Sequence, residues 1–166
     1  MILLDSPYLL YNGDINYMKE GFSLKMIYRI QSAILCFVGI GALFGGALAI
    51  YDPYGISFGM PTDVLKTGPF TNFLIPGLFL FFAIGVGHLI SFIFVKRRLK
   101  FHAYISGGAG CILMGWILIQ CYIMRSVASL HVIFFLVGLF ESSIALYMLV
   151  KLKLFPFTKK GQMHSF

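Results

Sequence analysis

Glu141 is the residue whose position in the chain most strongly suggests chemistry. It lies near the middle of Leu130 to Val150, a stretch that is otherwise uncharged and has about the 20 residues needed to cross a bilayer. A charged carboxylate at that depth costs about 3 kcal/mol or more, so it needs a partner, a proton or a cavity. The residues three and four positions away include Gly138 and Ala145, which is typical of a face that packs against another helix. We therefore expect Glu141 to point into a helix bundle.

His88 and Gln120 are the polar side chains that we consider as its partners. At a rise of about 1.5 Å per residue, His88 is expected about 6 Å to the cytoplasmic side of mid-bilayer, within reach of Glu141, and Gln120 roughly 10 Å to the outer side. Two interpretations follow: a site coupled to a proton or substrate, or a buried polar clasp that holds helices in register. No nucleophile is paired with a base, so we predict no catalytic residue.

Cysteine spacing argues against redox or metal chemistry. Cys36, Cys111 and Cys121 lie within apolar stretches, show no CxxC spacing and have no neighbouring histidine. They are expected to be small buried side chains, and we predict neither a metal nor a cofactor.

The composition is that of an integral membrane protein. Of the 166 residues, 59% are hydrophobic and only 11% are charged, whereas about a quarter are charged in soluble domains. The formal net charge of +7 comes from basic residues beside apolar stretches, where they meet anionic lipid. We predict the lipid bilayer, and anionic lipid at the basic cytoplasmic loops, as partners. Nucleic acid is not predicted, and a membrane-protein partner or a second copy of the chain stays open.

Four apolar stretches predict an all-α bundle of four transmembrane helices. The expected spans are about 30–51, 73–95, 102–124 and 130–150, within one domain of residues 30–150. Three basic residues precede the first span, four follow the second and four follow the last, and only Lys66 and Arg125 lie elsewhere. Because cytoplasmic segments carry the positive excess, both termini are expected in the cytoplasm. The protein itself is expected in the cell membrane.

The segments outside the spans carry further predictions. Residues 1–29 are expected to be a cytoplasmic segment with a turn at Asn12-Gly13-Asp14, and residues 151–166 a basic cytoplasmic tail. Whether 1–17 is an upstream extension, with Met18 as the true start, stays open. The connection 52–72 is apolar and rich in turn residues, so we expect it to pack as a lid over a binding mouth or as a cap on the bundle.

Small residues predict close contact between helices, within this chain rather than in a dimer. The positions are spaced four apart in the first and third spans, with one more beside Glu141: Gly41, Gly45, Gly107, Cys111, Gly115 and Gly138.

Several short motifs resemble a family of small, uncharacterised bacterial four-span membrane proteins with no assigned activity. The similarity covers roughly Arg29 to Val150, and its motifs are Asp52-Pro53, Gly59-Met60-Pro61, Pro69-Phe70, Pro76-Gly77 and Gln120. It implies fold and location and provides no catalytic residue. Small multidrug exporters are similar in having four spans and one membrane glutamate, but theirs lies in the first span. DoxX-like and vitamin K reductase-like bundles are similar in span count, and the latter have a CxxC that is missing here.

Three function classes are consistent with these features. The first expectation is a non-catalytic accessory or small-ligand-binding protein. The alternative is a proton-coupled transporter that uses Glu141 and His88. The third is a membrane enzyme acting on a quinone or lipid.

Overall fold

The fold is known from a computed structural model, which describes residues 7–152 except 58, 60–61 and 66–68. For residues 7–22 and 64 it describes the backbone alone. The described residues form helices joined by turns, without a strand.

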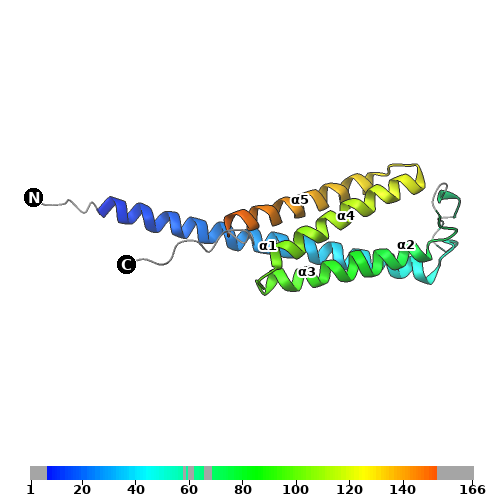
Figure 1. The fold of residues 1–166 in the computed structure, drawn as a ribbon, viewed down its shortest axis with the longest axis horizontal. Helices are drawn as coiled ribbons and strands as arrows, with labels where there is room; N and C mark the ends of the chain where they lie inside the picture. Colours follow the sequence, from blue (N-terminus) through cyan, green and yellow to red (C-terminus); the bar gives the residue numbers. More distant parts are fainter. Residues whose placement is uncertain (1–6, 58, 60–61, 66–68, 153–166) are drawn as a thin grey trace, which may run out of the picture.

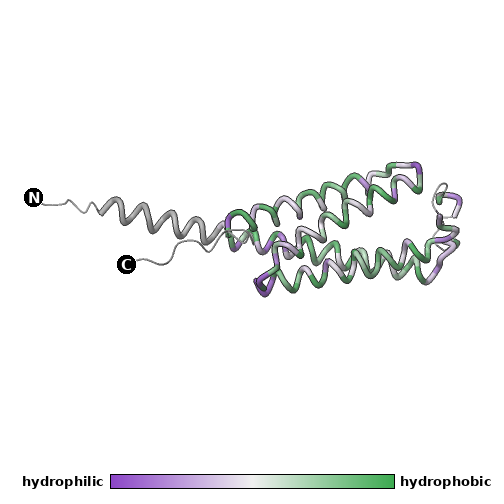
Figure 2. Tube along the Cα trace, viewed as in Figure 1, coloured by the Kyte–Doolittle hydropathy of each residue, from purple (hydrophilic) through white to green (hydrophobic). Residues whose placement is uncertain are grey.

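Four helical segments are long and apolar enough to cross a membrane: Ser23–Tyr51, Leu74–Lys96, His102–Met124 and Ser129–Lys151. The first is part of α1 (Pro7–Tyr51), and the last two are α4 (His102–Met124) and α5 (Ser129–Lys151). The second consists of three consecutive pieces, α2 (Leu74–Phe79), η2 (Leu80–Val86) and α3 (Gly87–Lys96). Apolar residues dominate the middle of these segments and polar residues gather at their ends (Figure 2). The predicted four-helix transmembrane fold is confirmed.

The four spans are arranged as two hairpins (Figure 1). α1 packs along the second span, and α4 packs along α5. The hairpins lie close where α3 leads into α4 and diverge toward the opposite end, where the connection after α1 lies. We call the first end the basic end, because Lys25, Lys96 and Lys151 lie there, and the second the loop end. The last turn of α5 lies at the basic end, beside the start of the first span.

Glycines allow the closest approach within each hairpin. A Cβ added to Gly138 would lie 2.8 Å from the carbonyl oxygen of Gly110, so α4 and α5 touch backbone to backbone. In the first hairpin a Cβ on Gly46 would lie 2.7 Å from the backbone nitrogen of Phe81. Any side chain at these positions would push the helices apart.

The other predicted packing positions differ among themselves. A Cβ on Gly107 would contact Ala145 at 3.2 Å and one on Gly45 would contact Leu80 at 3.4 Å, whereas Gly41 and Gly115 face open space. Cys111 is exposed, and its Sγ lies 3.7 Å from Ser142 Oγ. A four-residue step advances about 40° beyond a full turn, so a stripe spaced four apart drifts around the helix and leaves the contact face.

The first helix is longer than expected. α1 runs unbroken from Pro7, so the predicted turn at Asn12-Gly13-Asp14 is wrong. Each residue added to an existing helix gains a hydrogen bond, which offsets the roughly 1 kcal/mol cost of a glycine. The side chains of this part of α1, and the tail 153–166, lie outside the described residues.

The connection between the first two spans is tied at both ends. The backbone N–H of Phe73 donates to the carbonyl oxygen of Pro53 at 2.8 Å, and that of Ser57 donates to Asp52 Oδ2 at 2.6 Å. The connection contains one short helical turn, η1 (Thr62–Val64). Asn72 Oδ1 accepts a hydrogen bond from the N–H of Leu74 and so starts the second span.

A candidate site between the two hairpins

Glu141 and His88 meet inside the bundle. Glu141 Oε2 lies 3.3 Å from His88 Nε2, and both side chains are fully buried. The contact joins α5 of one hairpin to α3 of the other. The distance is that of an ion pair, although the atoms are not aligned as a hydrogen bond. The structure thus brings together the two residues that the sequence predicts as a pair.

The hydrogen bond of His88 Nδ1 determines whether Nε2 carries a hydrogen in the neutral ring. Nδ1 lies 2.8 Å from the carbonyl oxygen of Ile84, which can only accept, so Nδ1 carries a hydrogen and donates it. In a neutral ring Nε2 then presents a lone pair to Glu141 Oε2, and two lone pairs repel each other. The contact is attractive only when a proton lies on one of the two atoms. The pair is neutral overall in either form that holds one proton, which suits its complete burial.

Gln31 of α1 is a third member that the sequence analysis missed. Its side chain is fully buried, and Nε2 donates to the backbone oxygen of Glu141 at 3.3 Å. A glutamine beside the expected start of a span is ordinary, so only the lengths and tilts of the helices could have revealed this contact. We call Gln31, His88 and Glu141 the polar cluster.

The polar cluster contains acceptor atoms that lack donors. Among the described residues, Gln31 Oε1 and both carboxyl oxygens of Glu141 are buried without a hydrogen-bond partner. Buried acceptors of this kind are rare and costly. The arrangement therefore favours a bound proton, and it would accept a hydrogen-bond donor or a cation at the same place.

α4 makes room for the polar cluster. A Cβ on Gly110 would lie 3.1 Å from the Cβ of Glu141 and 2.6 Å from Ser142 Oγ. Only a residue without a side chain lets α5 bring Glu141 this far into the bundle. All four spans therefore contribute to this point, three by side chains and one by its backbone.

Gln120 has no contact with the polar cluster and lies nearer the loop end. It lines a crevice of about 390 Å³ between the hairpins, which we call the inter-hairpin crevice. Most of its walls are apolar: Val38, Gly41, Ala42, Gly45, Leu80, Ile84, Leu113, Ile117, Leu130 and Phe134. Ile84 connects the two regions, since its side chain lines the crevice and its carbonyl oxygen accepts from His88.

Trp116 and His131 are residues with hydrogen-bond donors that line the inter-hairpin crevice. Trp116 is 5% exposed, its ring stacks on Phe79 at 4.4 Å, and Nε1 has no partner among the residues that the structure describes. His131 Nδ1 accepts from the N–H of Ala128 at 3.0 Å, so its Nε2 carries the hydrogen. Three residues that carry donor groups, Trp116, His131 and Gln120, thus line the crevice.

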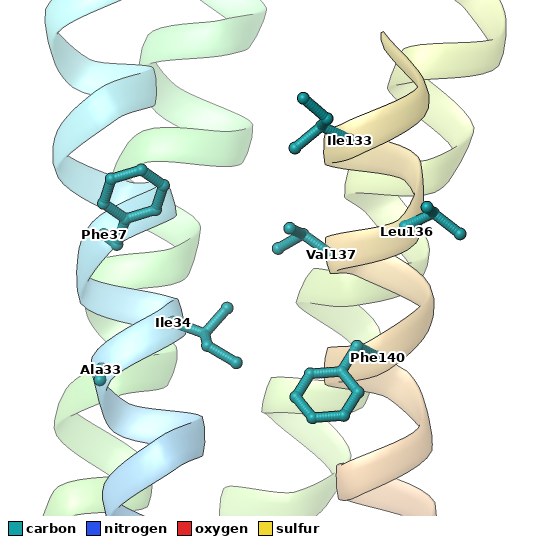
Figure 3. A pocket seen from close by; sticks show the side chains of 7 residues that line it. All are labelled: Ala33, Ile34, Phe37, Ile133, Leu136, Val137 and Phe140. Carbon is teal, nitrogen blue, oxygen red and sulfur yellow. The ribbon is translucent and has the colours of Figure 1, made fainter. Parts of the chain in front are cut away.

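A second, shallower opening lies between α1 and α5 (Figure 3). This lateral groove has a volume of about 530 Å³, and its lining is Ala33, Ile34, Phe37, Ile133, Leu136, Val137 and Phe140. The side chains of Ile34 and Val137 face each other across it in Figure 3. Ile34 is one helical turn from Val38 in the crevice, and α1 and α5 contribute to the walls of both openings. The lateral groove is therefore an apolar opening within the spans that lies one helical turn from the crevice.

Comparison with known proteins gives no relative: no family model, curated protein or solved structure matches the chain. The similarity to small bacterial four-span proteins stays a prediction. The residues above therefore carry the functional argument alone.

Proposed function

We propose that the chain is a non-catalytic membrane protein of the cell membrane that binds a small apolar ligand carrying a hydrogen-bond acceptor. The observation that supports this most directly is the indole N–H of Trp116, which is buried without a partner at the wall of the inter-hairpin crevice. A rotation of the indole that turns this N–H into the crevice would let a ligand carbonyl or ether oxygen accept from it.

The size and lining of the crevice support this proposal. Ligand pockets usually have volumes of about 300–1,000 Å³ and apolar walls with a few placed polar groups. The inter-hairpin crevice, at about 390 Å³, lies within that range and has apolar walls with Trp116, Gln120 and His131 among them. The lateral groove supplies a path from the bilayer, where an apolar ligand concentrates.

In this proposal the polar cluster is a clasp. It lies where the hairpins are joined, and Gln31, His88 and Glu141 tie α1, α3 and α5 together. A clasp near the middle of the spans leaves the helices on its loop-end side free to separate, which is where the crevice lies.

The orientation with both termini in the cytoplasm is part of the proposal. The basic end carries Lys25, Lys96, Arg98, Lys100 and Lys151, whereas Arg125 is the basic residue described at the loop end. Positive residues are enriched on the cytoplasmic side.

Trp116 provides the test, because it is the single tryptophan of the chain. The protein in phosphatidylcholine nanodiscs is titrated with 10-bromo-2-decanone, whose bromine quenches indole fluorescence, and with 1-bromodecane, which lacks the acceptor. We expect saturable quenching by the ketone at a mole fraction roughly fivefold lower than for the bromoalkane, as one net hydrogen bond would give.

Gly41→Leu and Gly108→Leu form a matched pair of variants. A Cβ at either position meets no atom within 4 Å, but Gly41 lines the crevice and Gly108 does not. Gly41→Leu should abolish the saturable phase, and Gly108→Leu should leave it unchanged. Linear quenching of equal strength by both probes in every variant would refute crevice binding.

Proton-coupled transport is the second candidate, favoured by the buried contact between an acid and a base, Glu141 and His88, in the middle of the spans. A transporter should collapse a pH gradient across proteoliposomes faster when 10-bromo-2-decanone is added, and Glu141→Gln should remove that effect. A protein that binds the ligand without transporting protons should leave the gradient unchanged. Its Glu141→Gln variant should still show fluorescence quenching by the ligand.

A further inference from the structure

A groove at the basic end gathers four positive charges from two spans. Lys25 and Arg29 belong to α1, Lys96 ends α3, and Arg98 lies in the turn that follows. The groove has a volume of about 500 Å³, and all four side chains are exposed. Within the described ranges, none of the four lies at ion-pair distance from a carboxylate. We call it the cationic groove.

The backbone holds Arg98 in place. The N–H of Leu99 donates to Phe94 and the N–H of Arg98 donates to Val95, at 3.0 and 3.1 Å, which is the Schellman arrangement that ends a helix. Arg98 occupies the left-handed position of this arrangement, with φ of 52°. Glycine is the residue favoured there, so an arginine at this position suggests that its side chain is used.

Tyr28 forms a fixed platform for the Arg98 side chain. The guanidinium carbon lies 4.7 Å from the centre of the tyrosine ring. His102 Nδ1 lies 2.7 Å from the carbonyl oxygen of Leu99 and so carries the hydrogen, which leaves Nε2 to accept from the Tyr28 hydroxyl at 2.9 Å. His102 is buried, so the ring is anchored from behind. A guanidinium stacked on a ring keeps its N–H groups available at its edge for a phosphate.

The cationic groove is polar on its outer side and apolar on its inner side. Phe92 and Val95 line it toward the membrane interior, and Lys96 Nζ lies 5.2 Å from the centre of the Phe92 ring. Lys96 marks the end of the apolar second span, so the charges lie at headgroup depth and Phe92 at acyl-chain depth. A phospholipid has the same order of chemistry along its length.

We propose that the cationic groove is a binding site for the phosphate of an anionic phospholipid, with Arg98 and Arg29 as the main ligands of the phosphate oxygens. Lys25 and Lys96 add charge at the rim, and the first acyl carbons contact Phe92. A free phosphate shares the headgroup chemistry but would not use the apolar wall.

The test is lipid binding by the full chain in detergent, followed by native mass spectrometry with added phosphatidylglycerol or phosphatidylcholine. The double variant Arg29→Gln/Arg98→Gln removes two charges from the groove. The control Arg97→Gln/Lys100→Gln removes two charges from the same end outside it. We expect phosphatidylglycerol to bind about 25-fold more weakly to the groove variant, at about fivefold per lost cation, and less than about twofold more weakly to the control.

Two further arms complete the design. Lys25→Gln/Lys96→Gln weakens binding from the rim without touching Arg98 and its platform, and the Trp116 emission spectrum checks that every variant is folded. Inorganic phosphate added at the same concentration should fail to displace phosphatidylglycerol. Full displacement by phosphate would keep the anion site and refute the lipid as its source, and equal losses in the groove and control variants would overturn the site altogether.

Discussion

Glu141 Oε2 and His88 Nε2 lie 3.3 Å apart with both side chains fully buried, and the other nitrogen of His88 is already committed to the Ile84 carbonyl. The contact is therefore attractive only with a proton on one of the two atoms, and it joins α3 of one hairpin to α5 of the other.

Glu141 and His88 should be energetically coupled. Glu141→Gln keeps the shape of the side chain and offers an amide N–H to His88 Nε2, so it should cost about 1 kcal/mol, whereas Glu141→Ala should cost more because it leaves His88 without a partner. A cycle of Glu141→Gln and His88→Ala, read from unfolding in bicelles, should give a coupling of about 0.6 kcal/mol and up to about 1.7. Strict additivity at both neutral and acidic pH would mean that the contact contributes nothing.

Gly138→Ala should loosen the second hairpin. The added methyl would meet the carbonyl oxygen of Gly110 at 2.8 Å, so the backbones must separate, at a cost of about 1–3 kcal/mol. Gly115→Ala on α4 is the matched control, since its methyl meets no atom within 4 Å and its effect should stay within about 0.5 kcal/mol. Unfolding in mixed micelles measures both, and equal losses would show that α4 and α5 do not touch as described.

The turn after α1 should open in acid. The backbone N–H of Ser57 donates to Asp52 and holds the pKa of that carboxyl below its usual range. Because the pKa is lowered in the folded turn, its stabilising effect is present above the ordinary pKa of about 3.9 and is lost as pH falls through the lowered value.

Hydrogen exchange at the Ser57 amide measures this opening. Protection should decrease with falling pH in the natural chain, and Asp52→Asn should remove that pH dependence. Protection that is constant through the acidic range in the natural chain would exclude the proposed role of Asp52.

Labelling should place the basic end inside the cell. In a cysteine-free background, an impermeant thiol reagent applied to intact cells should modify Ser57→Cys at the loop end and spare Lys100→Cys at the basic end. Labelling of Lys100→Cys alone would reverse the proposed orientation.

The sequence predicts the spans well because each is a long apolar stretch with polar ends. The predicted spans 73–95, 102–124 and 130–150 lie within one residue of the helices at each end. Placing Glu141 and His88 in contact was also feasible, since helix rise fixes depth and small neighbours mark an interior face.

Gln31 and the inter-hairpin crevice were out of reach for sequence reasoning. Both depend on how the two hairpins pack against each other, whereas the backbone contacts of Gly110 with Gly138 and of Gly46 with Phe81 set the spacing within each hairpin. Spacing alone also misplaced Gly41, which points into the crevice rather than at a helix. Side-chain pattern sets which face is apolar, whereas the angle between helices is a property of the assembled bundle.

The second span contains a π-helical segment, η2, between its two α-helical pieces. Each π turn holds about one more residue than an α turn, so the segment sets the angle between the face of Leu74–Phe79 and that of Gly87–Lys96. Deleting one residue from Leu80–Val86 would rotate everything beyond it by about 100° and carry the imidazole of His88 away from α5. The π-helical winding of Leu80–Val86 therefore determines whether His88 faces Glu141. Leu80 and Ile84 of that stretch also line the crevice, so whatever occupies the crevice lies against the element that sets this alignment.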